Sequence, residues 1–138
     1  MKITLHGTWK LNVDKSMVEP GPLFRSELRV YLATDDEDLK LSVQGIDATG
    51  TAYSYTAAGK VDGKDCAMTG SGTRNGADST SWTRVDSYTV DSTVKKAGNV
   101  VNLARLEVSK DGTVLTIRER GTNASGVPTR GIRIYDRQ

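Results

Sequence analysis

Apolar and polar residues alternate along most of the chain with the period of two that is typical of a half-buried β-strand. Segment 39–43, which reads Leu-Lys-Leu-Ser-Val, is a clear case. Helical periodicity is scarce, and turn residues recur about every eight to twelve positions. The pattern predicts strands at residues 7–13, 26–34, 38–46, 51–58, 64–69, 78–85, 88–96, 99–109, 113–121 and 128–136.

Tight turns separate several of these strands. The pairs Asp62-Gly63, Asn75-Gly76 and Asp111-Gly112 combine residues that tolerate the positive φ of short hairpin turns, and Ala97-Gly98-Asn99 interrupts two strand patterns in the same way. Short connections let consecutive strands pair as hairpins, and closing such a meander removes its exposed edges. The predicted fold class is therefore all-β, an antiparallel up-and-down β-barrel of about eight to ten strands.

Size and composition indicate a single globular domain. Its 138 residues fit a single domain, 1–138, with no proline-rich linker, because all three prolines lie at strand edges or in the connection 14–25. Hydrophobic residues make up 36% and charged residues 26%, as in ordinary soluble domains. A net charge of +2 provides no broad field for nucleic acid or an anionic membrane, so neither partner is expected.

The scarcity of cysteine and histidine limits the chemistry. A single cysteine, Cys66, excludes an internal disulfide framework and a Cys-rich zinc site. A single histidine, His6, excludes multi-His metal sites and weakens any Ser-His-Asp reading. There is no glycine-rich phosphate loop between a strand and a helix, which excludes nucleotide binding of that kind. With these residues missing, we predict no metal site and no cofactor. Without a signal peptide or an apolar membrane span, the sequence as written predicts a cytoplasmic protein; the alternative is an exported protein whose signal is not included.

One segment of the chain occurs twice in similar form. Residues 39–50 and 115–126 align without a gap, and both end in a Gly-x-Asx-Ala-Thr/Ser-Gly turn. Leu39, Leu41 and Val43 share the face predicted to point inward. In the second copy Glu119 takes the place of Val43, so the pattern puts a carboxylate inside the barrel.

An inward carboxylate is a candidate site residue, because burying an acid is costly unless it is paired or hydrogen-bonded. In an apolar cavity, desolvation would raise the pKa of Glu119 and make it usable as an acid or base. Alternatively, Glu119 lies in water at the rim or pairs with a neighbouring arginine. Arg105 is one such partner, since the Asp111-Gly112 hairpin joins the two strands.

Aromatic and methionine side chains supply candidate ligand contacts. Tyr53 and Tyr55 alternate on one strand face, and Tyr and Trp offer apolar area with a polar tip. Met17, Leu23, Phe24 and Met68 are candidates for a pliable lid over the mouth. The alternative is ordinary core packing. The candidate ligand-binding residues are Met17, Phe24, Tyr53, Tyr55, Met68, Trp82, Arg105 and Glu119.

The start Gly-Thr-Trp-Lys-Leu-Asn at residues 7–12 resembles the first strand of a lipocalin-type (calycin) barrel. The motifs at 108–112, 121–126 and 135–136 extend the resemblance to a mostly uncharacterised set of small bacterial lipocalin-like proteins. The resemblance implies that Trp9 closes the barrel floor and that a basic residue of the last strand, for which we choose Arg133, packs across it. The strand at 116–120 is more charged than this family pattern.

Two functions follow from this interpretation. The first is a carrier that binds a small, mostly apolar or amphipathic molecule in the barrel cavity, as a monomer or a homodimer. The second is a small-molecule isomerase or cyclase in the same cavity, with Glu119, Tyr53 and Tyr55 as acid/base groups. The sequence leaves open whether the protein is an enzyme, and a module that acts through its loops is a third possibility.

Overall fold

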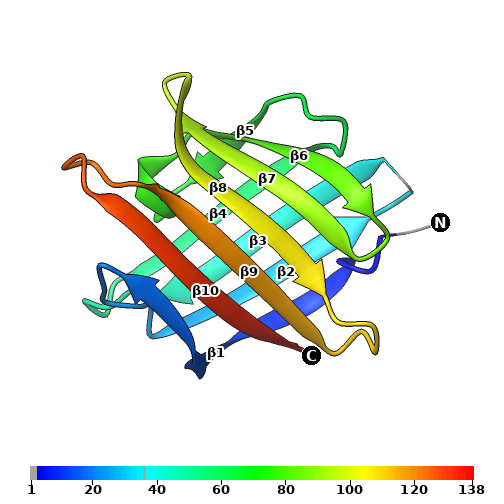
Figure 1. The fold of residues 1–138 in the computed structure, drawn as a ribbon, viewed down its shortest axis with the longest axis horizontal. Coiled ribbons are helices and arrows are strands. Elements are labelled where there is room, and N and C mark those ends of the chain that lie inside the picture. Colours follow the sequence, from blue (N-terminus) through cyan, green and yellow to red (C-terminus); the bar gives the residue numbers. More distant parts are fainter. Residues whose placement is uncertain (1–2, 36) are drawn as a thin grey trace.

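The computed structural model describes residues 3–35 and 37–138, and in them ten antiparallel strands form a closed barrel (Figure 1). This confirms the predicted all-β fold class. One short 3-10 helix, η1 (Arg74–Gly76), lies between β5 and β6. The strands are β1 (Gly7–Glu19), β2 (Ser26–Ala33), β3 (Asp38–Ile46), β4 (Ala52–Lys60), β5 (Cys66–Gly70), β6 (Ser79–Asp86), β7 (Thr89–Lys96), β8 (Asn99–Val108), β9 (Val114–Thr122) and β10 (Pro128–Arg137).

The barrel is a meander in which each strand pairs with the next and β1 pairs with β10 to close the ring. All ten predicted strands are present, but β1 extends well beyond the predicted range 7–13. A β-bulge between Asn12 and Met17 lets β1 continue along β10. Within the bulge, the Ser16 hydroxyl accepts a hydrogen bond from the backbone N–H of Ile134 at 2.8 Å, which anchors the irregular segment.

One end of the barrel, which we call the closed end, is sealed by an aromatic floor. Trp9 is fully buried and donates its indole N–H to the Leu5 carbonyl at 2.9 Å. The guanidinium of Arg137 lies 4.2 Å from the centroid of the Trp9 ring, a cation–π contact. Arg137 also donates to the carbonyls of Thr4 and His6, both at 2.8 Å, and so ties the N-terminal segment to the last strand.

The expectation that Arg133 packs across Trp9 is wrong, and the strand register gives the reason. Trp9 is directly opposite Arg137 in the β1–β10 ladder. Arg133 lies four residues before Arg137 on β10 and points into the middle of the barrel, where it is buried.

The opposite end, which we call the loop end, carries the connections 20–25, 47–51, 71–78, 97–98 and 123–127. The connection 71–78, which contains η1, packs onto this end. Asn75 donates its side-chain amide to the Val101 carbonyl on β8 at 3.0 Å. Gly72 has φ +71° and lies so close to Tyr53 that an added Cβ would be 2.5 Å from the Tyr53 Cβ. This close approach brings the neighbouring Arg74 to the barrel interior.

In the described part of the chain, no helix has the length and apolar character needed to cross a membrane.

Candidate functional site

Five charged side chains meet inside the barrel. Four of them come from strands and are almost inaccessible to solvent, and the fifth comes from η1, with 18% of its side chain exposed. They are Glu27, Arg29, Arg74, Glu119 and Arg133. Burying charge is costly unless the charges are paired and hydrogen-bonded, so their contacts determine what the interior can do.

Glu27 on β2 is the centre of one half of this charge cluster. Its carboxylate accepts hydrogen bonds from Arg29 Nε at 2.6 Å and from the Tyr135 hydroxyl at 2.5 Å. The Tyr53 hydroxyl donates to its second oxygen, also at 2.5 Å. Burial by itself would raise the pKa of Glu27, but the charges of Arg29 and Arg133 and the two phenols outweigh burial and lower it to about 2. Glu27 is therefore ionised at neutral pH.

Glu119 on β9 is the centre of the other half. Arg133 Nε donates to Glu119 Oε2 at 2.8 Å, and a second nitrogen of the same guanidinium contacts that oxygen as well. Arg74 Nε lies 2.5 Å from Glu119 Oε1. Burial would raise the pKa of Glu119, but Arg133 and Arg74 outweigh it and the pKa is lowered. The expectation of a raised pKa for Glu119 is wrong, because the surroundings are cationic rather than apolar.

The predicted pairing of Glu119 with Arg105 is also wrong. Arg105 lies on the outer face of the barrel, half exposed, and binds both carboxylate oxygens of Asp91 at 2.8 and 2.9 Å. Its neighbour Leu106 faces the interior and is buried, and side chains alternate along a strand. Arg105 is thus on the wrong face to contact anything inside the barrel.

Beside Glu119, several buried polar atoms have no hydrogen-bond partner within the described residues. They are Nε and Nη2 of Arg74, Oδ1 of Asn102 and Oε1 of Glu119. The contact between Arg74 and Glu119 is thus an ion pair without hydrogen-bond alignment. Buried polar groups in folded proteins are nearly always satisfied, so such a concentration at one place needs an explanation.

Two of these residues, Arg74 and Asn102, line a small internal cavity of about 40 Å³. That is room for about three water molecules. The lining of the cavity is mixed. Polar groups come from Arg29, Arg74, Arg133 and Asn102, and apolar groups from Met68, Trp82, Leu106 and Ile117. The interior is therefore not the open, mostly apolar chamber expected from the sequence, because arginine and tyrosine side chains fill it.

Two predicted acid/base residues, Tyr53 and Tyr55, lie inside the barrel with their rings stacked at 6.4 Å between centroids. The Tyr55 hydroxyl accepts a hydrogen bond from Arg29 Nη2 at 3.0 Å. Burial raises the pKa of Tyr55 to about 12 and also raises that of Tyr53, where Glu27 adds to the effect. Both phenols are therefore neutral near pH 7 and act as hydrogen-bonding groups.

Of the other predicted ligand contacts, Trp82 and Met68 line the cavity. Phe24 packs against Tyr53 with 5.6 Å between ring centroids. Met17 is 45% exposed on the outer face of β1, opposite Ile132 of β10. Met17 takes no part in the predicted lid, because β1 continues through its segment and its side chain lies on the outer face of the barrel.

The sequence-based search missed several residues of the interior, namely Glu27, Arg29, Tyr31, Arg74, Asn102 and Tyr135. Some signal was present: Glu27, Arg29 and Tyr31 alternate with apolar residues on one strand, and Arg133 and Tyr135 do so on another. A period-two polar series indicates a polar inner face as readily as a solvent face. Arg74 lies in a connection and carried no such signal.

Solved structures with the same architecture are bound to small molecules in several cases. Zebrafish ileal bile acid-binding protein complexed with cholic acid has a TM-score of 0.57 at 10% identity, covering 98% of this chain and 99% of that one. A redesigned β-barrel, mFAP1, bound to DFHBI has a TM-score of 0.54 at 14% identity, covering 97% and 95%. The fluorescent protein UnaG, as its N57A mutant, has a TM-score of 0.65 at 14% identity, covering 98% and 96%.

At these identities the likeness shows the fold alone, a closed antiparallel β-barrel of ten strands. No family model matches the chain, and no curated protein sequence matches it significantly. The resemblance to a bacterial lipocalin-like group therefore stays a prediction.

Proposed function

We propose that the chain binds a small amphipathic molecule inside the barrel. Its polar group lies among Arg74, Asn102 and Glu119, and its mostly apolar body lies against the wall that includes Trp82 and Ile117. The single observation that carries this proposal is that two residues with unsatisfied buried polar atoms, Arg74 and Asn102, line a buried cavity whose lining also contains apolar side chains. A bound molecule with one polar end and an apolar body would match both kinds of group.

The unsatisfied atoms define the chemistry of that polar group. Arg74 Nη2 is a donor that lacks an acceptor, and Asn102 Oδ1 is an acceptor that lacks a donor. The complementary group both donates and accepts, as a hydroxyl, a carboxylic acid or a primary amide does. Three arginines face two glutamates in the charge cluster, so an oxygen that carries partial negative charge is favoured.

The cavity is too small to admit a whole ligand without movement of part of the chain. About 40 Å³ accommodates the polar group but not the body of a larger molecule. Of the three arginines, Arg74 is the one held by a connection rather than a strand. We therefore expect the 71–78 connection to move when a ligand enters from the loop end.

The proposal is tested with a Trp9→Phe variant, in which Trp82 is the remaining tryptophan and reports on the cavity. The probes are cholate and DFHBI, and the readout is Trp82 fluorescence. We expect a saturable change with a stoichiometry near one for at least one probe. Adding Arg74→Met should weaken binding at least about ten-fold, because a charge-assisted hydrogen bond to the ligand is lost.

Arg130→Met is the matched control, since Arg130 lies on the outer face and pairs with Glu19. It should leave the affinity unchanged. The absence of any saturable response, or equal affinities for the Arg74 and Arg130 variants, would overturn the proposal.

The isomerase or cyclase alternative gains no support. Glu119 is held as a carboxylate by two arginines, and Tyr53 and Tyr55 are neutral with raised pKa values. None of the three has a pKa near neutrality, which is where efficient general acid/base catalysis requires it.

A further inference from the structure

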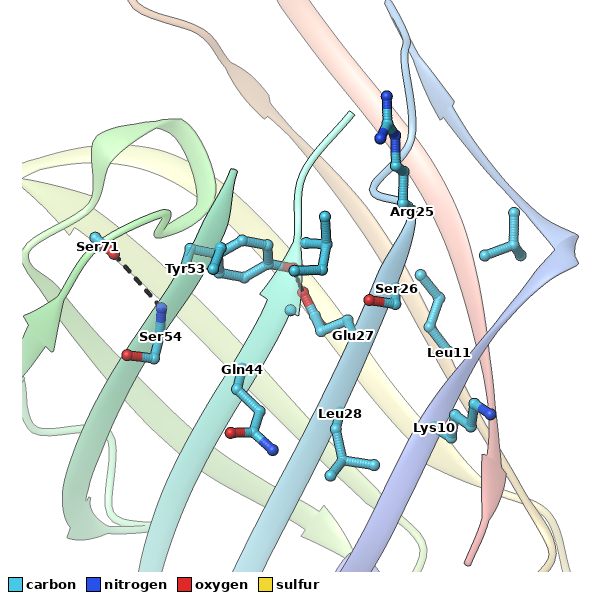
Figure 2. A pocket seen from close by; sticks show the side chains of 14 residues that line it. Lys10, Leu11, Arg25, Ser26, Glu27, Leu28, Gln44, Tyr53, Ser54 and Ser71 are labelled. Atoms are coloured by element: carbon cyan, nitrogen blue, oxygen red, sulfur yellow. Dashed lines mark hydrogen bonds between the residues drawn. The ribbon is translucent and has the colours of Figure 1, made fainter. Parts of the chain in front are cut away.

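The barrel wall opens where β1 and β2 separate, near the loop end. The ladder between them ends at the pair Lys10 and Leu28. Beyond this pair, β1 is paired only with β10, and β2 is paired only with β3. A groove of about 680 Å³ occupies the opening and continues over the outer face of β2, β3 and β4 (Figure 2). This volume lies in the range of small-molecule binding pockets.

The floor of the groove is a row of outward-facing side chains that are directly opposite one another across four strands. Lys10 pairs with Leu28, Leu28 with Gln44, and Gln44 with Ser54. At the end of this row, the Ser54 backbone N–H donates a hydrogen bond to the Ser71 hydroxyl at 3.4 Å (Figure 2).

Apolar side chains form the rest of the lining. Leu28 and Ile46 are half-buried in the floor, and Leu11 and Val13 of β1 form the side where the wall opens. Val13 is 42% exposed and lines the groove together with these other apolar side chains. The groove thus offers a continuous apolar surface that a hydrocarbon or aromatic body can cover.

The exposed charge of the groove is positive. Lys10 and Arg25 line it, and neither forms an ion pair with any residue among 3–35 and 37–138. Glu27 is the one acid among the lining residues, but only 1% of its side chain is exposed and its charge is matched by arginines inside the barrel. A ligand in the groove therefore meets two cations and no accessible anion.

We propose that this groove is a second binding site, separate from the barrel interior, for a small amphipathic anion. The anionic group lies between Lys10 and Arg25, and the apolar body lies over Leu28 and Ile46 towards Val13. The proposal does not rest on the interior site, because Lys10, Arg25, Leu28 and Ile46 do not line the interior cavity. Glu27 and Tyr53 border the groove as well as the interior charge cluster.

The test uses 8-anilinonaphthalene-1-sulfonate as the probe. Its sulfonate is an ionised acceptor that cannot donate to Asn102, so it is poorly matched to the interior site. Its binding is followed by backbone amide shifts of the ¹⁵N-labelled protein. We expect saturable shifts concentrated at Leu28, Gln44 and Ser54, with little change at Ile117 inside the barrel.

Charge reversal supplies the matched comparison. Lys10→Glu should weaken binding of this probe at least about five-fold, because an attraction at close range becomes a repulsion. Lys40→Glu changes the net charge of the protein equally, on the outer face of β3 but outside the groove. It should have little effect.

Equal affinities of the Lys10 and Lys40 variants, shifts concentrated in the interior, or no saturable shift would each overturn the proposal. The outcome is distinguishable from that of the interior proposal. Lys10→Glu should leave the Trp82 response to cholate or DFHBI unchanged, and Arg74→Met should leave sulfonate binding in the groove unchanged.

Discussion

Replacing Glu27 with glutamine removes the charge that holds half of the interior together. The carboxylate accepts hydrogen bonds from Arg29, Tyr53 and Tyr135, and only 1% of the side chain is exposed. Glutamine has nearly the same shape but leaves Arg29 and Arg133 without this counter-charge. Three buried or half-buried guanidinium groups then share the single carboxylate of Glu119.

Two lines of reasoning give the size of the effect. Removing one partner of a buried ion pair typically costs about 3–5 kcal/mol. The lowering of the Glu27 pKa from 4.5 to about 2 corresponds to about 3 kcal/mol of stabilisation of the folded state at neutral pH. Both free energies exceed the contribution of a typical exposed ion pair. Compared with a total stability of about 5–15 kcal/mol, the expected loss is large.

The assay is urea unfolding at pH 7 followed by circular dichroism, with Glu107→Gln as the control. Glu107 forms an exposed ion pair with Arg118, so its replacement should cost less than about 1 kcal/mol. A Glu27→Gln variant within 1 kcal/mol of the wild type would refute the reasoning, because the carboxylate would then have no net role in the charge cluster.

The pH dependence provides a second check on the same residue. The folded-state pKa of Glu27 is depressed, so its contribution is fully present above the unfolded-state value near 4.5 and is lost as the pH falls towards about 2. The stability difference between the wild type and Glu27→Gln should therefore be constant from pH 7 to about 5 and shrink below that. A difference that stays constant down to pH 3 would contradict the assignment.

Three further predictions concern other parts of the molecule. Arg137→Ala should lower the free energy of unfolding by about 1–3 kcal/mol, since it removes the cation–π contact with Trp9 and the bonds to backbone carbonyls; a thermal melt unchanged from the wild type would contradict this. Gly45→Ala should cost about 1–3 kcal/mol in chemical unfolding, because the added Cβ would lie 2.7 Å from the Tyr53 ring, and a neutral result would contradict the close approach. Burial and nearby acids raise the pKa of the Cys66 thiol, so iodoacetamide should modify it more slowly than free cysteine at pH 7.5; equal rates would contradict the burial.

The barrel could be predicted from the sequence because its determinants are local. Period-two alternation marks the strands, and Asx-Gly pairs mark the turns. The repeated segment also behaves as the alignment indicates. Asp47 accepts hydrogen bonds from the backbone N–H groups two and four residues later, and Asn123 does the same in the second copy. Val43 and Glu119 are both buried at equivalent places, as the alignment predicts.

The partners of the inward side chains could not be predicted in this way, because they depend on how the ring closes. The register between β1 and β10 decides that Arg137, not Arg133, lies over Trp9. Arg133 of β10 contacts Glu119 of the neighbouring β9 within one hairpin, and ring closure brings the same guanidinium within 3.4 Å of Glu27 on β2.

Arg74 illustrates a different limit of the sequence. Its position follows from the path of a connection that contains two left-handed glycines and Asn75, whose φ is +54°. No periodic pattern applies to such a segment, although its side chain completes the interior.

Small-molecule binding inside the barrel can be observed by native mass spectrometry of the freshly purified protein, repeated after incubation with excess cholate or DFHBI. In a Lys10→Glu background, in which anion binding in the groove is weakened, we predict one non-covalent adduct per chain, retained from purification or formed on incubation, which Arg74→Met loses and Arg130→Met keeps. The bare mass under every condition, or an adduct that both variants keep equally, would contradict a small-molecule site inside the barrel.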